Sequence, residues 1–243
     1  MTSTHRRNCL VTGANRGIGL EFTRQLLARG ERVLAACRHP GKATALNALA
    51  GEHPGRLHLL PLDVAEAKSR AALVHELPLV LGGDGDEEPG RLDLLVNNAG
   101  VLHSGERFGH VEQAILEDSL RTNAVGPFLL AQALAPLLAD GARVANLSTV
   151  MASIAGRTEF RSPSYCASKA AQNMLTVQLA QALAARRIVV LALHPGWVMT
   201  EMGGEHATVA TTDAVAGLLQ VMDGATPAQS GNFLDWRGQS LPW

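Results

Sequence analysis

The stretch NCLVTGANRGIG, residues 8–19, joins a short apolar run to a glycine-rich turn, and a stretch with helical spacing, Ile18–Arg29, follows it. The apolar run Asn8–Val11 is typical of a strand that is covered on both faces. Glycines at such a turn let the backbone come close to a ligand, and the start of a helix presents unpaired N–H groups. The stretch therefore predicts a strand, a phosphate-binding turn and a helix.

The same alternation continues along the chain. Between the further apolar runs lie helical stretches such as Ala167–Ala185. We expect strands at Arg32–Ala36, Leu57–Leu60, Leu92–Val96, Arg143–Leu147 and Ile188–Leu193, with Gly231–Asp235 as a candidate last strand. This pattern predicts an α/β fold of the Rossmann type, a doubly wound parallel sheet of about seven strands between two helical layers. No repeat or linker divides the sequence, so we expect residues 1–243 to form a single domain.

Composition excludes several classes of protein. The chain has 243 residues, 47% of them hydrophobic, and a net charge of −1 with mixed signs, which does not favour a nucleic-acid or membrane-surface partner. Its three cysteines show no metal-site or disulfide spacing. No apolar stretch approaches the roughly 20 residues that span a bilayer, and no leader pattern is present, so we expect a cytoplasmic protein. The acidic segment Gly82–Gly90 lacks the spacing of a calcium loop and is expected to be a solvated loop.

Two arginines indicate which dinucleotide the glycine turn would bind. An NAD site usually has a carboxylate after the second strand, where it accepts from the ribose 2′-OH. Here that strand ends in Arg38, and no acid takes the position. Arg38 and Arg16 could both meet a 2′-phosphate, which favours NADP(H) over NAD(H). The alternative is that both are ordinary surface arginines.

Tyr165 and Lys169 stand four residues apart at the start of a predicted helix, so they share one face. A free phenol has a pKa of about 10, too high for ready proton exchange near neutrality. A nearby ammonium favours the phenolate, and so does the positive nicotinamide of an oxidised cofactor. The spacing therefore indicates a general acid for reduction and a general base for oxidation. The alternative is a packing role for Tyr165, the only tyrosine in the chain.

The chain resembles the short-chain dehydrogenase/reductase family over its whole length. The motifs that carry the resemblance follow in the family's order: Thr12–Gly19, Leu62-Asp63-Val64, Asn97-Asn98-Ala99-Gly100, Thr122-Asn123, Asn146-Leu147-Ser148-Thr149, Tyr165–Lys169 and Pro195-Gly196. The stretches 194–198 (HPGWV), 200–204 (TEMGG) and 238–243 (GQSLPW) resemble the branch with C-factor and sniffer-type carbonyl reductases.

The resemblance implies a set of cofactor contacts. Asp63 is expected at the adenine with Val64 beside it, and Val198 with Thr200 at the nicotinamide carboxamide. Asn98 could equally have a purely structural role. The full set comprises Gly13, Asn15, Arg16, Gly17, Ile18, Gly19, Arg38, Asp63, Val64, Asn97, Ala99, Gly100, Tyr165, Lys169, Pro195, Gly196, Val198 and Thr200.

The resemblance also implies the catalytic residues Asn123, Thr149, Tyr165 and Lys169. Asn123 is expected to bend its helix and to hold a water in the proton path to Lys169. The family binds the substrate oxygen with a serine, whose place is taken here by Thr149, on a longer loop than usual. A threonine hydroxyl can form the same hydrogen bond, and Ser148 and Ser153 are the competing residues.

We therefore expect an NADP(H)-dependent oxidoreductase that reduces an aldehyde or ketone, or oxidises the alcohol, and that needs no metal. A cofactor-binding signalling or interaction protein with little turnover is the alternative. The resemblance implies a homodimer or homotetramer. Trp197, Met199 and Met202 could cover the substrate or could be core or interface residues. The sequence does not identify the substrate.

Overall fold

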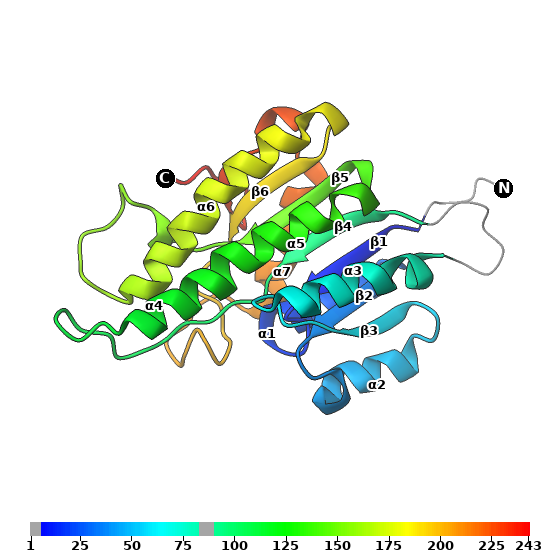
Figure 1. The fold of residues 1–243 in the computed structure, drawn as a ribbon, viewed down its shortest axis with the longest axis horizontal. Coiled ribbons are helices and arrows are strands. Elements are labelled where there is room, and N and C mark those ends of the chain that lie inside the picture. Colours follow the sequence, from blue (N-terminus) through cyan, green and yellow to red (C-terminus); the bar gives the residue numbers. More distant parts are fainter. Residues whose placement is uncertain (1–5, 83–89) are drawn as a thin grey trace.

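The structure, a computed structural model, describes residues 6–82 and 90–243, so most of the predicted acidic loop, residues 83–89, lies outside the described residues. Seven parallel strands form one sheet in the order β3-β2-β1-β4-β5-β6-β7 (Figure 1). They are β1 Asn8–Thr12, β2 Arg32–Cys37, β3 Leu57–Pro61, β4 Leu92–Asn97, β5 Leu138–Leu147, β6 Val189–His194 and β7 Phe233–Asp235. The strand order reverses between β1 and β4, and a doubly wound sheet binds its ligand at this point.

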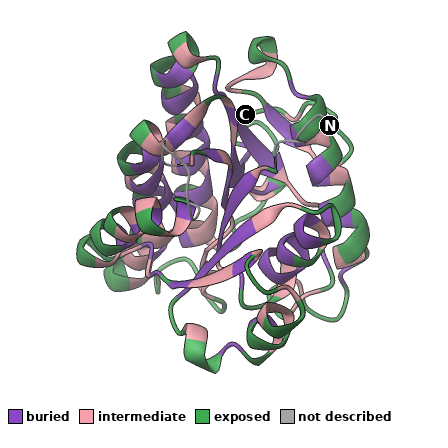
Figure 2. Cartoon of the chain, turned by 90° about the vertical axis from the view of Figure 1, so that its right-hand side faces the viewer, coloured by how far each residue is buried: buried purple, intermediate pink, exposed green. Residues whose placement is uncertain are grey.

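Helices cover both faces of the sheet, as Figures 1 and 2 show. The helices are α1 Gly17–Ala28, α2 Thr44–Glu52, α3 Ala67–Leu81, α4 Gln113–Leu120, α5 Gly126–Leu134, α6 Pro163–Leu183 and α7 Thr211–Gly224. Side chains of α1, α2 and α7 pack on one face, and those of α3, α5 and α6 pack on the other. The predicted three-layer α/β architecture is confirmed.

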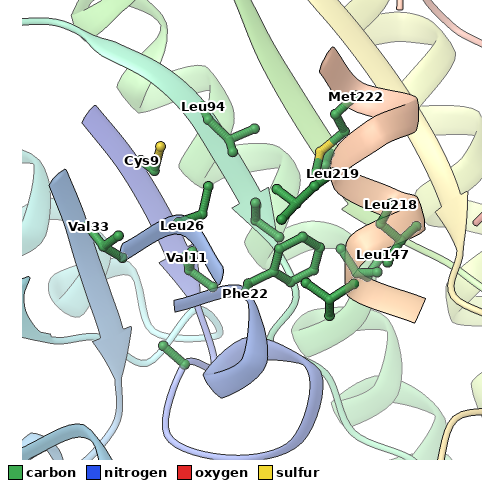
Figure 3. Packing of buried hydrophobic residues seen from close by; sticks show 14 of the residues in the cluster. Cys9, Val11, Phe22, Leu26, Val33, Leu94, Leu147, Leu218, Leu219 and Met222 are labelled. Carbon is green, nitrogen blue, oxygen red and sulfur yellow. The ribbon is translucent and has the colours of Figure 1, made fainter. Parts of the chain in front are cut away.

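The alternation of side chains along each strand produces two separate cores. Cys9 and Val11 of β1 belong to the core under α1 and α7, whereas Leu10 between them belongs to the opposite core. Figure 3 shows Phe22 of α1 and Leu219 of α7 meeting over the strands of the first core. Each fully buried Leu or Phe contributes roughly 1.5–3 kcal/mol to stability. Because both faces of the sheet are packed in this way, the strands and the segments at their carboxyl ends have fixed positions.

The predicted strands are all present, with one marked difference in length. β5 begins at Leu138, five residues before the predicted Arg143, because Leu138 pairs with Leu92 across an irregularity in the ladder. Helix α6 begins at Pro163, so Tyr165 lies in its first turn. None of the described helices is long and apolar enough to cross a membrane. Among the described side chains, no group of three or more His, Cys, Asp or Glu could hold a metal ion.

Candidate functional site

A cavity of about 560 Å³ lies at the carboxyl ends of the strands, beside the point where the strand order reverses. Its volume is in the usual range for small-molecule and cofactor sites, roughly 300–1,000 Å³. Its walls come from the glycine turn, the ends of β2 and β5, the segments after β3, β4 and β6, and the start of α6. The predicted residues that line it are Gly13, Asn15, Arg16, Gly17, Ile18, Arg38, Asp63, Val64, Ala99, Gly100, Tyr165, Lys169, Pro195 and Thr200.

Two glycines of the turn sit where no side chain fits. A Cβ added at Gly19 would lie 2.3 Å from the carbonyl oxygen of Gly13, and Gly13 itself has a φ of +64°. The Asn98 amide donates to the carbonyl oxygens of Thr12 and Gly13 at 2.9 and 3.2 Å. Asn98 thus links the end of β4 to the glycine turn. This contact corresponds to the structural role considered for Asn98.

The segment after β2 adds a basic residue that the sequence analysis missed. The short 3₁₀ turn Pro40–Lys42 brings Lys42 to the same cavity wall as Arg38. Both side chains are exposed, and no carboxylate follows the strand within this turn. The sequence shows Lys42 four residues after Arg38, but only the 3₁₀ turn determines that its side chain reaches the cavity. The part of the cavity wall formed by the segment after β2 therefore carries two positive charges.

Arg16 has a partner that its sequence position did not reveal. Its guanidinium forms an ion pair with the carboxylate of Glu201, in the segment between β6 and α7. The neighbouring Thr200 lies directly over the glycine turn, because a Cβ added at Gly17 would be 3.4 Å from its methyl group. The segment after β6 therefore contacts the glycine turn through two consecutive residues.

Lys169 and Tyr165 occupy the cavity floor at the first turns of α6. Lys169 is 4% exposed, and its ammonium donates to the Leu147 carbonyl at 2.7 Å and to Gln172 Oε1 at 3.0 Å. Burial lowers the pKa of Lys169 to about 7. Burial also raises the pKa of Tyr165 to about 12, and the neighbouring Cys166 adds to the rise.

The direction of the Tyr165 shift differs from the expected lowering by Lys169. The physical reason is desolvation, which disfavours the charged form of both groups. In the protein alone, burial is the main cause of the raised pKa of Tyr165, and Lys169 is not among the groups that shift it. The positive nicotinamide remains as the charge that would favour the phenolate.

Asn123 lies in an irregular helical turn, in line with the helix bend that the family resemblance implied. Residues Arg121–Val125 form a π-helical turn between α4 and α5. The Asn123 amide accepts from Val101 N at 2.8 Å and donates to Val101 O and to Ser168 Oγ. A Cβ added at Gly100 would lie 3.0 Å from Asn123 Oδ1 and 3.7 Å from Lys169 Nζ. Asn123 is thus held beside Lys169 with one glycine between them, below the cavity surface.

The three hydroxyls considered for the substrate oxygen differ in how they are bonded. Ser148 lines the cavity, but its hydroxyl donates to Asn173 Oδ1 at 2.6 Å. Ser153 is fully buried, donates to the Trp243 carbonyl and accepts from Gly156 N. The Thr149 hydroxyl accepts from Met151 N at 3.2 Å, and within the described residues it donates to no acceptor. Thr149 is 8% exposed and, unlike Ser148, is not among the residues that line the cavity.

The remaining predicted residues lie just outside the cavity wall. Asn97 is buried at the end of β4, and its side-chain amide donates to Asn146 Oδ1 of the neighbouring strand β5 at 2.8 Å. Gly196 has a φ of +84°, and Val198 is buried and bridges to Val209. Gly196 and Val198 thus determine the path of the backbone between Pro195 and Thr200, which both line the cavity.

Comparisons with known proteins agree with this geometry. The model of the short chain dehydrogenase family matches residues 7–209. C-signal from Myxococcus xanthus is 40% identical over 156 residues, which cover 63% of this chain and 94% of that protein.

Two solved structures extend the agreement to the whole fold. The NADPH-bound carbonyl reductase from chicken fatty liver is 35% identical with a TM-score of 0.90, covering 98% of this chain and 100% of that one. The carbonyl reductase Sniffer of D. melanogaster is 31% identical with a TM-score of 0.91 and the same coverage, 98% and 100%. The chain is therefore an oxidoreductase that belongs to the short-chain dehydrogenase family, in the branch of C-signal and the sniffer-type carbonyl reductases.

Proposed function

We propose that this protein reduces an aldehyde or ketone with NADPH, and that Tyr165 delivers the proton to the carbonyl oxygen. One observation carries the proposal: Tyr165 and Lys169 line the same cavity as the glycine turn Gly13–Gly19. A hydride carrier held by the turn and a proton donor on α6 would then face one reacting carbon. The reverse reaction, oxidation of an alcohol, uses the same groups.

The cavity suits a nicotinamide dinucleotide. At Gly19 and Gly13 a side chain would collide with the protein's own backbone, so glycine lets the turn pack tightly at the start of α1. The start of α1 offers N–H donors to a pyrophosphate. Asp63 and Val64 would hold the adenine end, and Pro195 with Thr200 the nicotinamide end. When bound, the cofactor supplies or accepts the hydride.

NADP(H) is proposed over NAD(H) on the charge of one wall. Arg38 and Lys42 both line the cavity after β2, where an NAD site would have a carboxylate. A 2′-phosphate can accept hydrogen bonds from guanidinium and ammonium donors. The structure of the chicken carbonyl reductase, which binds NADPH, supports the same choice.

Proton transfer is assigned to Tyr165, with Lys169 behind it. The phenol stays protonated over the physiological pH range, since its pKa is about 12, and is therefore ready to act as an acid. Lys169 can restore the proton, because its pKa near 7 lets it exchange with solvent at neutral pH. Asn123, fixed to Val101 and Ser168, would hold the water that connects Lys169 to solvent.

Thr149 is proposed as the group that holds the substrate oxygen. Its hydroxyl accepts the Met151 N–H and keeps its own proton for a substrate, whereas the Ser148 proton is already donated to Asn173. A donor aimed at the oxygen stabilises the negative charge that develops there during hydride transfer.

The test follows the absorbance of NADPH during incubation with a panel of aldehydes and ketones. We expect turnover with part of the panel, and Tyr165→Phe should lower it by about 10²–10⁴-fold while NADPH still binds. Equal turnover in the wild type and in Tyr165→Phe would refute the proton-transfer role.

The similarity to C-signal supports a second candidate function, that of a cofactor-binding signalling protein, which the same experiment tests. Binding of NADPH without its oxidation by any carbonyl compound, and without reduction of NADP⁺ by any alcohol, would favour this second function.

A further inference from the structure

We propose that Glu201 competes with a phosphate group of the cofactor for the side chain of Arg16 and so weakens cofactor binding. The inference rests on the proposed function, because it takes the ligand of the cavity to be a nicotinamide dinucleotide. It assigns a role in specificity to a residue outside the expected cofactor contacts.

The position of Arg16 makes it a natural ligand for phosphate. It precedes α1 directly, in extended backbone with a φ of −159°, and its side chain is 60% exposed at the cavity wall. A guanidinium has five N–H donors in a planar arrangement that matches phosphate oxygens. In this structure, however, the Arg16 guanidinium is turned to the carboxylate of Glu201.

Glu201 is delivered to Arg16 by the backbone of its own segment. Thr200 packs against Gly17, its hydroxyl accepts from Gly203 N at 3.1 Å, and the Trp197 indole donates to the Gly203 carbonyl at 2.7 Å. These contacts do not involve Glu201, so the segment keeps its place over the glycine turn when the carboxylate is removed. The competition can therefore be tested by removing the charge alone.

The strength of the pair sets the size of the effect. Both side chains are largely exposed, at 60% and 79%, and solvent screens such a pair. The carboxylate therefore delays and weakens phosphate binding without preventing it. A phosphate group of the cofactor, with its negative charge and several acceptor oxygens, replaces the carboxylate when the cofactor enters, and the Arg16–Glu201 pair has to break.

The experiment compares Glu201→Gln with Glu205→Gln, and measures the dissociation constants of NADPH and NADH by titration of the purified protein. Glu205 is an exposed acid in the same segment that forms no ion pair with Arg16 in the described part of the chain, so its variant removes the same charge and leaves the Arg16–Glu201 pair in place. We expect Glu201→Gln to tighten binding by about two- to fivefold at low salt, with a smaller change at high salt. Glu205→Gln should change binding by less than that.

The two cofactors identify the phosphate. Tightening of NADPH alone assigns Arg16 to the 2′-phosphate, and equal tightening of NADPH and NADH assigns it to the pyrophosphate. Unchanged or weaker binding in Glu201→Gln overturns the proposal, and so does the same gain in an Arg16→Gln background. A wild type that prefers NADH would refute the proposed cofactor preference, yet the Glu201 comparison would still be decided by its own result.

Discussion

The two ends of the site are built in different ways. At the glycine turn, backbone touches backbone, and a Cβ at Gly19 or Gly13 would approach main-chain atoms within 2.9 Å. The three segments after β4, β5 and β6, which extend from one side of the sheet in Figure 1, carry large apolar side chains exposed to solvent. These are Phe108, Ile154, Phe160, Trp197, Met199 and Met202.

The difference shows which part of the molecule can vary. Phe108 and Phe160 contact each other edge to face with ring centroids 5.7 Å apart, although both are more than half exposed. Exposed apolar side chains close together are typical of a surface that receives a ligand. Of these side chains, Met202 lines the cavity. We therefore expect the main chain of the glycine turn to hold the cofactor and side chains on the loops to select the substrate.

After the loss expected for Tyr165→Phe, the largest effect is expected at Thr149, in the segment directly after β5. Replacing Thr149 by Val removes one hydroxyl and keeps the shape, so we expect kcat to fall by about 10²–10³-fold, because the developing oxyanion loses a donor. NADPH affinity should stay within a factor of about two, since the removed hydroxyl is proposed to contact the substrate and not the cofactor. Steady-state kinetics and a cofactor titration measure the two quantities.

Ser148→Ala is the matched comparison, because its hydroxyl proton is bonded to Asn173. We expect a smaller loss of kcat in this variant. A larger loss in Ser148→Ala than in Thr149→Val would move the substrate-oxygen role to Ser148.

A smaller effect is expected from filling the glycine turn. In Gly19→Ala the new methyl would sit 2.3 Å from the Gly13 carbonyl oxygen, so the turn has to shift. Overpacking of this kind costs about 1–3 kcal/mol, which corresponds to roughly 5- to 150-fold in NADPH affinity if the cost falls on binding. Calorimetric titration measures the affinity, and thermal unfolding measures the share that falls on stability.

Gly51→Ala is the control for this variant, because nothing lies within 4 Å of a Cβ at Gly51 in α2. We expect unchanged affinity and slightly higher stability there, since alanine favours the helix. Equal affinities in the Gly19 and Gly51 variants would contradict the account of the turn.

The smallest effect concerns stability and pH. Burial lowers the pKa of Lys169 from 10.5 to about 7, so between pH 7 and about 10 the unfolded chain binds a proton that the folded chain lacks. The folded state therefore gains stability from this group as pH rises through that window. We expect the gain between pH 7 and pH 9 to be smaller in Lys169→Met than in the wild type.

The measurement is urea unfolding of both proteins without cofactor, and the difference between them removes the contribution of other groups. Parallel stability curves in this pH range would contradict the lowered pKa.

The sequence was sufficient for the fold and for the glycine turn, since both depend on local patterns. Continuous apolar runs revealed the buried strands, and glycine marked positions with positive φ or close backbone contact. The start of β5 was missed because Ala139, Asp140 and Gly141 do not form an apolar run. The strand begins earlier because Leu138 pairs with Leu92, and the ladder then shifts before Arg143 pairs with Leu94.

The parts of the site that escaped prediction depend on long-range contacts. Glu201 is 185 residues from Arg16 and is exposed, so no periodicity marks it. The raised pKa of Tyr165 follows from burial, which spacing alone does not reveal, and it reverses the effect expected from Lys169. The oligomeric state expected from the resemblance stays a prediction.

The π-helical turn at Arg121–Val125 has a consequence for how this sequence tolerates insertions and deletions. A π turn holds one residue more than an α turn, and one residue corresponds to about 100° of rotation around a helix axis. The extra residue changes the phase between α4 and α5 and directs Asn123 to Val101 and Ser168. Loss of a single residue in this turn would rotate one helix relative to the other, so the length of the turn is tied to the position of Asn123 beside Lys169.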